Sequence, residues 1–558
     1  MIAAVLFGLV VIAVLFVAPA WTSWRARRHL LGRIRAEWTH SRDVPRDMDA
    51  VSDLFRSRSA AAISLDDRTW NDLLLDDVFM FLDRTESSVG QQVLYARLRS
   101  APAPKSLIAF DALVAGVASD ESRRERAQVR LAGLRSQAAY NLHRLADPDF
   151  LTSPRWYAVI PVWTVLSLLT MSLAYFRPAF MIAGAVCFVG NLAIRIVTAH
   201  RAVGQIAWFR QLGPLLSVAG ELVTFGTPET EPITGALAPD LASLRRLGRI
   251  ARWLSRDPLV TDALAFVILE FINLLFLLDA NGIYFASREL VARGPQLLRV
   301  IEAVGEIDAA IAVASFRSGA GVWVRPRFGP PVSRAAFADL RHPLVEAAVP
   351  NSIALAPPRG VLVTGSNMSG KSTFLRTVGI NVVLAQTINT CLAHAYEAPV
   401  YQVRSCIGRS DDLIAGKSYY LVEVEAVLAL VNASGQPAPH LFIFDELFRG
   451  TNAVERISAA EAVLATLISG SKRHVVLAAT HDGELVDLLH DSYTVCHFGD
   501  AVGPDGLTFD YRLAPGPATS RNAIALLELS GAPEAVVKRA LDRAAELDRQ
   551  RLRLSRQA

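Results

Sequence analysis

Residues 364–373 read Thr364-Gly365-Ser366-Asn367-Met368-Ser369-Gly370-Lys371-Ser372-Thr373. This stretch fits the pattern G-x-x-x-x-G-K-[ST], a glycine-rich loop that wraps the phosphates of a nucleotide. The run from Gly360 to Val363 before it is typical of a strand, and the run from Phe374 to Gln386 after it is typical of a helix. Because the pattern requires that strand and helix, the sequence predicts that the chain binds ATP or GTP.

The residue types of this loop suit a polyphosphate. Glycines allow backbone N–H groups to turn toward phosphate oxygens, and the N-terminus of the following helix adds a favourable dipole. Lys371 supplies a point charge for the outer phosphates, and the hydroxyl of Ser372 supplies a ligand for Mg²⁺. We therefore expect the nucleotide to be bound by Gly365, Ser366, Asn367, Met368, Ser369, Gly370, Lys371, Ser372 and Thr373.

Two further segments place polar residues at the ends of predicted strands. Leu441 to Phe444 is apolar and precedes Asp445 and Glu446, which is typical of a buried parallel strand with carboxylates at its tip. We expect Asp445 to hold Mg²⁺ and Glu446 to orient or deprotonate the attacking water. A third strand, Val475 to Ala479, precedes His481, which we expect to sense the terminal phosphate. Ligands bind at the carboxyl ends of the strands in open α/β sheets. We therefore expect the ends of these three strands to form one nucleotide-binding crevice.

Composition limits the other classes of function. A net charge of +4 over 558 residues gives no general argument for nucleic acid. The cysteines show no pairing or metal-ligand spacing, so we expect a reducing compartment, no disulfide framework, no zinc and no haem; they are Cys187, Cys391, Cys406 and Cys496. The 52% hydrophobic content is concentrated in a few segments.

Three of those segments predict membrane spans. Ile2 to Trp21 carries no charge and is followed by arginines, which favours an uncleaved anchor over a signal peptide. Trp156 to Phe176 and Ala179 to Val197 are separated only by Arg177-Pro178, and basic residues flank the outer ends of the pair. This pair predicts a hairpin that enters from the cytoplasm and returns to it; a buried soluble hairpin is the alternative.

A fourth apolar segment, Leu259 to Leu278, is interpreted differently. It carries Asp262, Glu270 and Asn273, which are costly in lipid, and both of its flanks are basic. A fourth span would also place the nucleotide loop outside the cell. We therefore expect a buried helix of a soluble helical domain, although contact with the membrane stays open.

The motifs together resemble the MutS family, within the ABC-type ATPases. Mismatch-repair members carry Thr-Gly-Pro-Asn-Met-Gly-Gly-Lys-Ser-Thr where this chain has residues 364–373. Residues 445–451 follow the family's Asp-Glu-x-x-Arg-Gly-Thr, residues 411–418 its Asp-Asp-Leu-x-x-Gly-x-Ser, and residues 478–481 its Ala-Thr-His switch. The resemblance covers about residues 340–541 and extends weakly to residues 82–94 and 304–314, which resemble the two ends of the family's helical core domain.

This resemblance implies a dimeric Mg²⁺-dependent ATPase with composite sites. Lys371, Ser372, Asp445 and Glu446 would act in one subunit, and Ser418 would reach the terminal phosphate from the other. It also implies a relation to DNA mismatch repair, but a membrane anchor stands where mismatch-recognition members have their mismatch-reading domain. The segment 520–522, Ser-Arg-Asn, departs from the usual Ser-Tyr-Gly, which puts that contact in doubt.

The predicted architecture is an α/β P-loop ATPase domain of ABC/MutS type, preceded by an all-α core and three transmembrane helices. Its parts are an anchor (1–24), a cytoplasmic helical segment that begins the core (25–155), a membrane hairpin (156–197), a lever-like helical core (198–328), and the ATPase domain with a C-terminal dimerisation element (329–558). This topology predicts a multi-pass protein of the inner membrane with its ATPase domain in the cytoplasm.

Three functions fit this architecture. The first is a membrane-tethered ATPase that contacts DNA, the second is a switch or scaffold that acts on protein or lipid, and the third, least favoured, is an ABC-type transporter. The basic run after the anchor fits either DNA or anionic lipid, and its position directly inside a span favours lipid; it consists of Arg25, Arg27, Arg28, Arg33 and Arg35.

Overall fold

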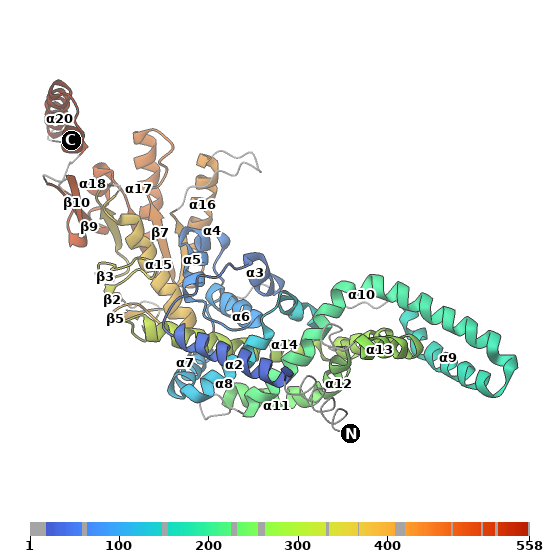
Figure 1. The fold of residues 1–558 in the computed structure, drawn as a ribbon. Helices are drawn as coiled ribbons and strands as arrows, with labels where there is room; N and C mark the ends of the chain where they lie inside the picture. Colours follow the sequence, from blue (N-terminus) through green and yellow to red (C-terminus); the bar gives the residue numbers. More distant parts are fainter. Residues whose placement is uncertain are drawn as a thin grey trace. The chain divides into compact units, whose positions relative to one another are not determined.

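The computed structural model describes residues 18–58, 64–147, 155–224, 231–254, 263–330, 334–366, 368–407, 419–469, 473–503, 506–518 and 523–555. These residues divide into two compact units, coloured along the sequence in Figure 1. One unit is helical and includes Leu82–Arg97 and Ala103–Gly319, together with the chain up to Ala60. The other contains the sheets and includes Ala61–Phe81, Leu98–Pro102 and the chain from Ala320 onward.

The helical unit is built from α-helices and short 3-10 helices. Its longest helix after the hairpin, α14, bends at Arg293, where φ is −129° and ψ is 15°, directly before Gly294 and Pro295. Proline removes a helical hydrogen bond and its ring crowds the preceding turn, which explains the bend. The elements are α2 (Ala18–Ala36), α3 (Met48–Ser57), α6 (Ser88–Arg99), α7 (Pro104–Ser119), α8 (Glu121–Leu131), η2 (Ala132–Leu134), η3 (Gln137–Ala146), η4 (Arg155–Ala158), α9 (Val159–Phe176), η5 (Pro178–Phe180), α10 (Met181–Thr224), α11 (Glu231–Ser243), α12 (Arg245–Leu254), α13 (Ala263–Phe276) and α14 (Leu278–Gly319).

The predicted hairpin is present as helices α9 and α10. Two stretches, Trp156–Phe176 and Pro178–Thr198, are long and apolar enough to cross a membrane by length and composition, and only 17% of each is buried. The two helices approach closely at Gly190, where an added Cβ would lie 2.3 Å from the Trp163 ring. Helix α10 then continues to Thr224, with Pro214 inside it, so one helix joins the hairpin to the rest of the helical unit.

Of the three predicted spans, the structure contains these two apolar helices. The first predicted span, Ile2 to Trp21, lies almost wholly outside the described residues. What the structure describes there is helix α2, whose Trp21 and Trp24 are 60% and 50% exposed.

The prediction for Leu259 to Leu278 was wrong on burial. The described part is a helix, α13, but Ile268, Phe271 and Phe276 are 51%, 56% and 42% exposed. Helix α13 packs against α9, α10 and α14, and among the described residues these three apolar side chains stay exposed on it.

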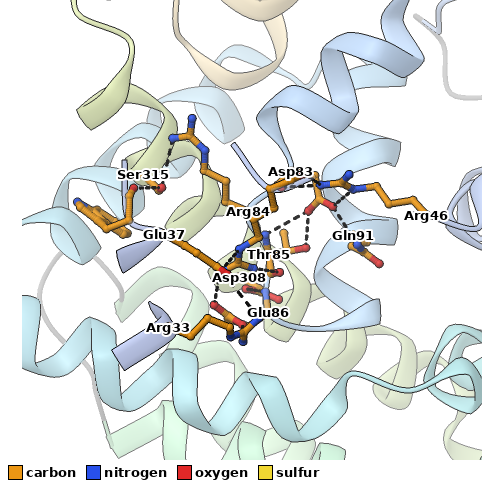
Figure 2. Close-up of polar contacts among 12 residues, drawn as sticks. Arg33, Glu37, Arg46, Asp83, Arg84, Thr85, Glu86, Gln91, Asp308 and Ser315 are labelled. Carbon is orange, nitrogen blue, oxygen red and sulfur yellow. Dashed lines mark hydrogen bonds and ion pairs between the residues drawn. The ribbon is translucent and has the colours of Figure 1, made fainter. Parts of the chain in front are cut away.

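A buried polar network joins the segment after α2 to the core of the helical unit (Figure 2). Glu86 is fully buried and accepts hydrogen bonds from Arg33 at 2.8 Å and Arg42 at 2.5 Å. Arg42 also donates to the carbonyl of Thr85 at 2.8 Å, and Arg46 donates to Asp83 at 2.7 Å. Buried ion pairs are costly to break because the remaining charge is left without a partner, so this network fixes the segment firmly.

The same network caps helix α6 from a distant part of the chain. Asp308 on α14 is fully buried, and its carboxylate accepts from the backbone N–H of Glu86 at 3.0 Å and of Ser87 at 2.8 Å. The hydroxyl of Ser87 donates to it as well, at 2.5 Å. These are donors just before and at the start of α6, which have no partner within the helix. Burial raises the pKa of Asp308 to about 7.

This network also bears on the basic run after the predicted anchor. Arg33 pairs with Glu86, and Arg35 pairs with Glu125 at 2.6 Å. These two arginines therefore have acidic partners within the helical unit, although Arg35 stays exposed, as do Arg25, Arg27 and Arg28.

The second unit is an α/β domain with two sheets. The larger sheet has the strand order β10-β9-β4-β8-β7-β6, in which only the β10–β9 pair is antiparallel; the smaller has the order β1-β5-β2-β3. The strands are β1 (Arg327–Phe328), β2 (Ala335–Leu340), β3 (Asn351–Leu355), β4 (Gly360–Thr364), β5 (Ala395–Ala398), β6 (Gln402–Cys406), β7 (His440–Asp445), β8 (Val475–Ala479), β9 (Tyr493–Gly503) and β10 (Gly506–Pro515). The helices are α4 (Asp67–Asp72), α5 (Leu75–Leu82), α15 (Lys371–Ile388), α16 (Tyr419–Ala433), α17 (Ala453–Ser469), α18 (Gly483–Leu489), α19 (Ala523–Leu529) and α20 (Glu534–Ser555).

Helix α4, far upstream in the sequence, belongs to this α/β unit. The carboxylate of Asp72 accepts hydrogen bonds from the hydroxyl of Ser405 and the backbone N–H of Ile407, both at 2.9 Å. Arg376 on α15 donates to the carbonyl of Asp72 at 2.8 Å. This segment was predicted to belong to the helical core region, but its contacts join it to strand β6 and to the helix that follows the glycine-rich loop.

Candidate nucleotide site

The candidate site lies at the carboxyl ends of three adjacent strands. In the register of the sheet, Val363 of β4 pairs with Ala479 of β8, and Asp445 of β7 pairs with the same Ala479. Strands β4, β7 and β8 are buried apolar runs with helices on their faces, as the sequence pattern predicted. The sheet therefore brings the loop after β4, the carboxylates after β7 and His481 after β8 to one edge.

The glycine-rich loop has the backbone that its glycines predicted. Gly365 and Gly370 have φ of +139° and +104°, conformations that residues with a side chain rarely adopt. At Gly365, an added Cβ would also lie 2.8 Å from the carbonyl oxygen of Phe498. Helix α15 begins at Lys371, directly after Gly370, so its free N-terminal N–H groups face the loop.

Lys371 is a buried cation held by the loop itself. Its side chain donates to the carbonyls of Gly365 and Ser366, both at 2.7 Å, and the residue is only 3% exposed. Burial lowers the pKa of Lys371, although the nearby carboxylates of Glu446 and Asp445 act in the opposite direction. An ammonium group with carbonyl partners in a buried loop suits an anionic ligand, because a phosphate would add the charge neutralisation that carbonyls lack.

The oxygens expected to bind magnesium also meet. The hydroxyl of Ser372, at the start of α15, is hydrogen bonded to the carboxylate of Asp445 at the tip of β7. Burial raises the pKa of Asp445, with the neighbouring Glu446 adding to the effect and the Ser372 hydrogen bond opposing it. Two hard oxygen ligands at hydrogen-bonding distance fit Mg²⁺, which takes oxygen ligands and keeps several waters. A divalent cation there would compensate the buried charge of Asp445.

Glu446 is the second carboxylate of the site, and basic side chains surround it. It pairs with Arg449 at 2.5 Å and with Nδ1 of His481 at 3.2 Å. Burial alone would raise the pKa of Glu446, but the hydrogen bond to His481 and the charges of Arg449 and Lys371 lower it below its usual range. Glu446 is therefore ionised at neutral pH, the form that can orient or accept a proton from water.

The backbone around Glu446 is strained. Glu446 and Phe448 have φ of +54° and +57°, which is uncommon for residues other than glycine. Glu423 of α16 stabilises this turn, because its carboxylate accepts a hydrogen bond from the backbone N–H of Phe448 at 2.6 Å. Strain of this kind clusters at functional sites. Arg449 lies in the motif at residues 445–451, but neither Arg449 nor Glu423 had a role predicted from the sequence.

The remaining predicted residues divide into three groups. Ser369 is buried, and its hydroxyl donates to the carbonyl of Ser366 at 2.8 Å, which closes the loop on itself. Met368 is 73% exposed, and Thr373 is also exposed. Asn367 and Ser418 lie outside the described residues, as do residues 411–417 and 520–522.

A family profile described as MutS domain V matches residues 361–548, which include every strand and helix of this site. Among curated proteins, the chain is 35% identical over 265 residues to the DNA mismatch repair protein MutS of Thermus thermophilus, covering 46% of this chain and 31% of that protein. It is 33% identical over 270 residues to DNA mismatch repair protein MutS 2 of Halobacterium salinarum, covering 46% of this chain and 30% of that protein. It is also 34% identical over 283 residues to the DNA mismatch repair protein MutS of Geobacillus thermodenitrificans, covering 48% of this chain and 30% of that protein. The chain thus spans about a third of the length of these relatives.

Proposed function

Since this chain belongs to the MutS family through its domain V, we propose that it binds ATP with Mg²⁺ and hydrolyses it to ADP and phosphate. The observation that carries this proposal is the meeting of Lys371, Ser372, Asp445 and Glu446 at the ends of adjacent parallel strands. Phosphoryl transfer needs chiefly positioned charge and an oriented water, and this arrangement supplies both.

Each residue has a role in this proposal. Lys371 leaves its carbonyl partners to bind the outer phosphates. Ser372 and Asp445 would hold Mg²⁺, which would neutralise charge on those phosphates. Glu446 orients the attacking water and accepts its proton. His481 holds the carboxylate of Glu446 from the side of β8, and in that position it senses the terminal phosphate.

We also propose that the active form is a homodimer with composite sites. Ser418, named from the family resemblance, would complete the site of a second copy. A dimer closed by the terminal phosphate and opened by hydrolysis would form a switch. Its output would pass through the helical unit, in which α10 runs unbroken from the hairpin to Thr224.

Helices α9 and α10 support attachment to a membrane. The two apolar stretches, Trp156–Phe176 and Pro178–Thr198, expose many apolar side chains, and Val162, Tyr175 and Ile182 are between 68% and 87% exposed. Exposure of this apolar surface to water would cost roughly 25 cal/mol of free energy per Å². We propose that the hairpin spans the inner membrane and that the ATPase unit faces the cytoplasm, as the basic flanks indicate.

The substrate of the switch is open between two classes. The relatives are named for DNA mismatch repair, which supports coupling of ATP turnover to DNA binding. The exposed apolar hairpin supports the alternative, a switch at the membrane face that acts on protein or lipid. Stimulation of ATP hydrolysis by duplex DNA, with binding that weakens steeply as salt rises, would favour the first class. Absence of DNA binding at low salt would leave the second.

The Glu446→Gln variant tests the ATPase assignment itself. It keeps the size of the side chain but cannot accept a proton, so we expect ATP binding to persist, hydrolysis to fall, and a nucleotide-bound dimer to accumulate. The exposed Glu484→Gln on α18 is the matched control and should hydrolyse ATP at the normal rate. Normal turnover by Glu446→Gln would refute the role of Glu446.

A further inference from the structure

The described part of helix α13, Ala263–Phe276, is shorter than a hydrocarbon core, and the flanks of the segment that it forms with the start of α14 are both basic. Its 14 residues rise about 21 Å at 1.5 Å per residue, against a hydrocarbon core of about 30 Å. Arginines flank it on both sides: Arg245, Arg246 and Arg249 lie on α12 before it, and Arg288 and Arg293 lie on α14 after it. Basic flanks mark the cytoplasmic side, so both ends of this segment belong there.

The turn between α13 and α14 lies partway along the membrane hairpin. Asn191 of α10 donates to the carbonyls of Leu274 and Leu275, and Asn281 of α14 donates to the hydroxyl of Thr164 on α9 at 2.9 Å. Counted along the hairpin from Trp156 and Thr198, these contacts lie about 10–15 Å from its basal ends at 1.5 Å per residue. The turn therefore reaches no deeper than about the middle of a 30 Å hydrocarbon core.

The turn satisfies its own backbone with side-chain amides. The last carbonyls of a helix have no partner within the helix, and in lipid each unsatisfied group costs several kcal/mol. Here Asn191 serves Leu274 and Leu275, while Asn281 serves the carbonyls of Phe276 and Leu277 at 3.0 and 3.1 Å. The two amides share their four N–H groups among these carbonyls and the hydroxyls of Ser167 and Thr164, and the carbonyl of Leu277 also accepts from the backbone N–H of Asn281. In an aqueous loop, water would do this without any side chain.

The charged groups of the segment are also paired. Glu270 of α13 forms an ion pair with Arg195 of α10, and the carboxylate of Asp279 accepts from Asn273 at 2.6 Å. Asp279 lies in the first turn of α14, where the helix dipole favours a negative charge. Two of the three polar groups that made this segment look unfit for lipid, Glu270 and Asn273, therefore have partners within the helical unit; the third, Asp262, lies outside the described residues.

We propose that α13 and the start of α14 form a re-entrant segment, in which α13 enters the cytoplasmic leaflet beside the α9–α10 hairpin and α14 returns to the same side. The occupant of its exposed face, carried by Ile268, Phe271 and Phe276, is the acyl region of that leaflet. This inference rests on the proposed membrane hairpin, whose exposed apolar surface is continuous with that face. A re-entrant segment leaves the chain after it on the same side of the membrane, so the α/β unit stays in the cytoplasm.

The test measures lipid contact at single positions. Cysteine variants Ile268→Cys and Phe271→Cys are labelled with a small fluorophore, and the full chain is reconstituted in phosphatidylcholine vesicles that carry nitroxide-labelled lipid. Val186→Cys on the hairpin, 60% exposed, is the membrane control, and Val454→Cys on α17, 76% exposed, is the aqueous control. Of the native cysteines, three are buried and Cys496 is partly buried, so the unmodified protein gives the background.

We expect the labels at Ile268 and Phe271 to be quenched by shallow nitroxide lipids and protected from aqueous iodide, as at Val186. Iodide quenching at both positions, with lipid quenching retained at Val186, would overturn the re-entrant segment and leave the hairpin standing. Protection from both quenchers would also overturn it, because a protein surface would then cover α13. Iodide quenching at Val186 would refute the hairpin and the inference together. Unchanged elution of each variant in gel filtration checks that the chain is folded.

Discussion

Because Asp308 caps helix α6, we expect the substitution Gly90→Ala, which adds one methyl group beside this cap, to destabilise the helical unit. Gly90 lies in the first turn of α6, and a Cβ added there would lie 2.2 Å from Oδ2 of Asp308 and 2.7 Å from its Cβ. Asp308 has no exposed surface, so it cannot move aside into solvent. The Gly90→Ala variant must therefore displace the carboxylate from the backbone N–H groups of Glu86 and Ser87.

Three terms decide the size of this effect. Alanine in a helix is favoured over glycine by up to about 1 kcal/mol. Overpacking of a filled core costs about 1–3 kcal/mol, and a buried donor that loses its partner costs about 1–3 kcal/mol. The losses exceed the gain, so we expect Gly90→Ala to destabilise the helical unit by about 2–4 kcal/mol. In contrast, Gly220 of α10 is exposed and has no atom within 4 Å of an added Cβ, so Gly220→Ala should be neutral or stabilising by up to about 1 kcal/mol.

The assay is hydrogen exchange of the detergent-solubilised chain, followed by mass spectrometry of peptides that cover α6. Exchange of these amides should accelerate in Gly90→Ala and not in Gly220→Ala. A second control is the Asp308→Ala variant, which removes the side chain that would clash with the added methyl group. In this background, Gly90→Ala should cause no further loss of stability. Equal protection of α6 in Gly90→Ala and the parent chain would refute the cap. The same cost with and without Asp308 would show that another contact is responsible.

The remaining predictions concern the nucleotide site and the α/β unit. Lys371→Met should weaken ATP binding by roughly 10- to 100-fold, since a charge-assisted hydrogen bond contributes about 1.5–3 kcal/mol, whereas the exposed Lys538→Met should bind normally; equal affinities by calorimetry would argue against Lys371 as a phosphate ligand. His481→Ala should lower kcat and leave ATP affinity nearly unchanged, so a variant that loses affinity with kcat intact would contradict the assigned role. Burial lowers the pKa of His342 and of His440 to about 4, so the folded unit binds fewer protons than the unfolded chain below pH 6.5. Its stability should therefore be full above pH 6.5 and fall toward pH 4; a His440→Gln variant should show a flatter profile of melting temperature against pH, and an unchanged slope would count against this origin.

The nucleotide site could be predicted from sequence because its parts are local. The glycine-rich loop, the strand before it and the helix after it are consecutive, and the structure extends the predicted strand and helix by only a few residues, to Gly360–Thr364 and Lys371–Ile388. The two other strands were identified by apolar runs that end in polar residues. Parallel strands bring their carboxyl ends to one edge, so Asp445 and His481 could be placed near the loop without knowledge of their contacts.

The polar network of the helical unit could not be predicted in the same way. Arg42, Glu86 and Asp308 lie far apart along the chain, and none belongs to a periodic pattern or a motif with a known mechanism. Each reads as a surface charge when taken alone, because charged residues are almost never fully buried unless they are paired. Only the fold shows that α14 brings a carboxylate to the start of α6.

Helix α13 shows how a correct rule can lead to a wrong result. The rule that polar residues are costly in lipid led from Asp262, Glu270 and Asn273 to a buried helix of a soluble domain. The cost applies to groups without partners, however, and here Glu270 pairs with Arg195 while Asn273 pairs with Asp279. The rule that basic flanks lie on the cytoplasmic side was also applied correctly, since both flanks of this segment are basic. It excludes only a segment that crosses the whole membrane. A segment that enters a leaflet and returns satisfies both rules, and it explains why asparagines cover the carbonyls at its turn.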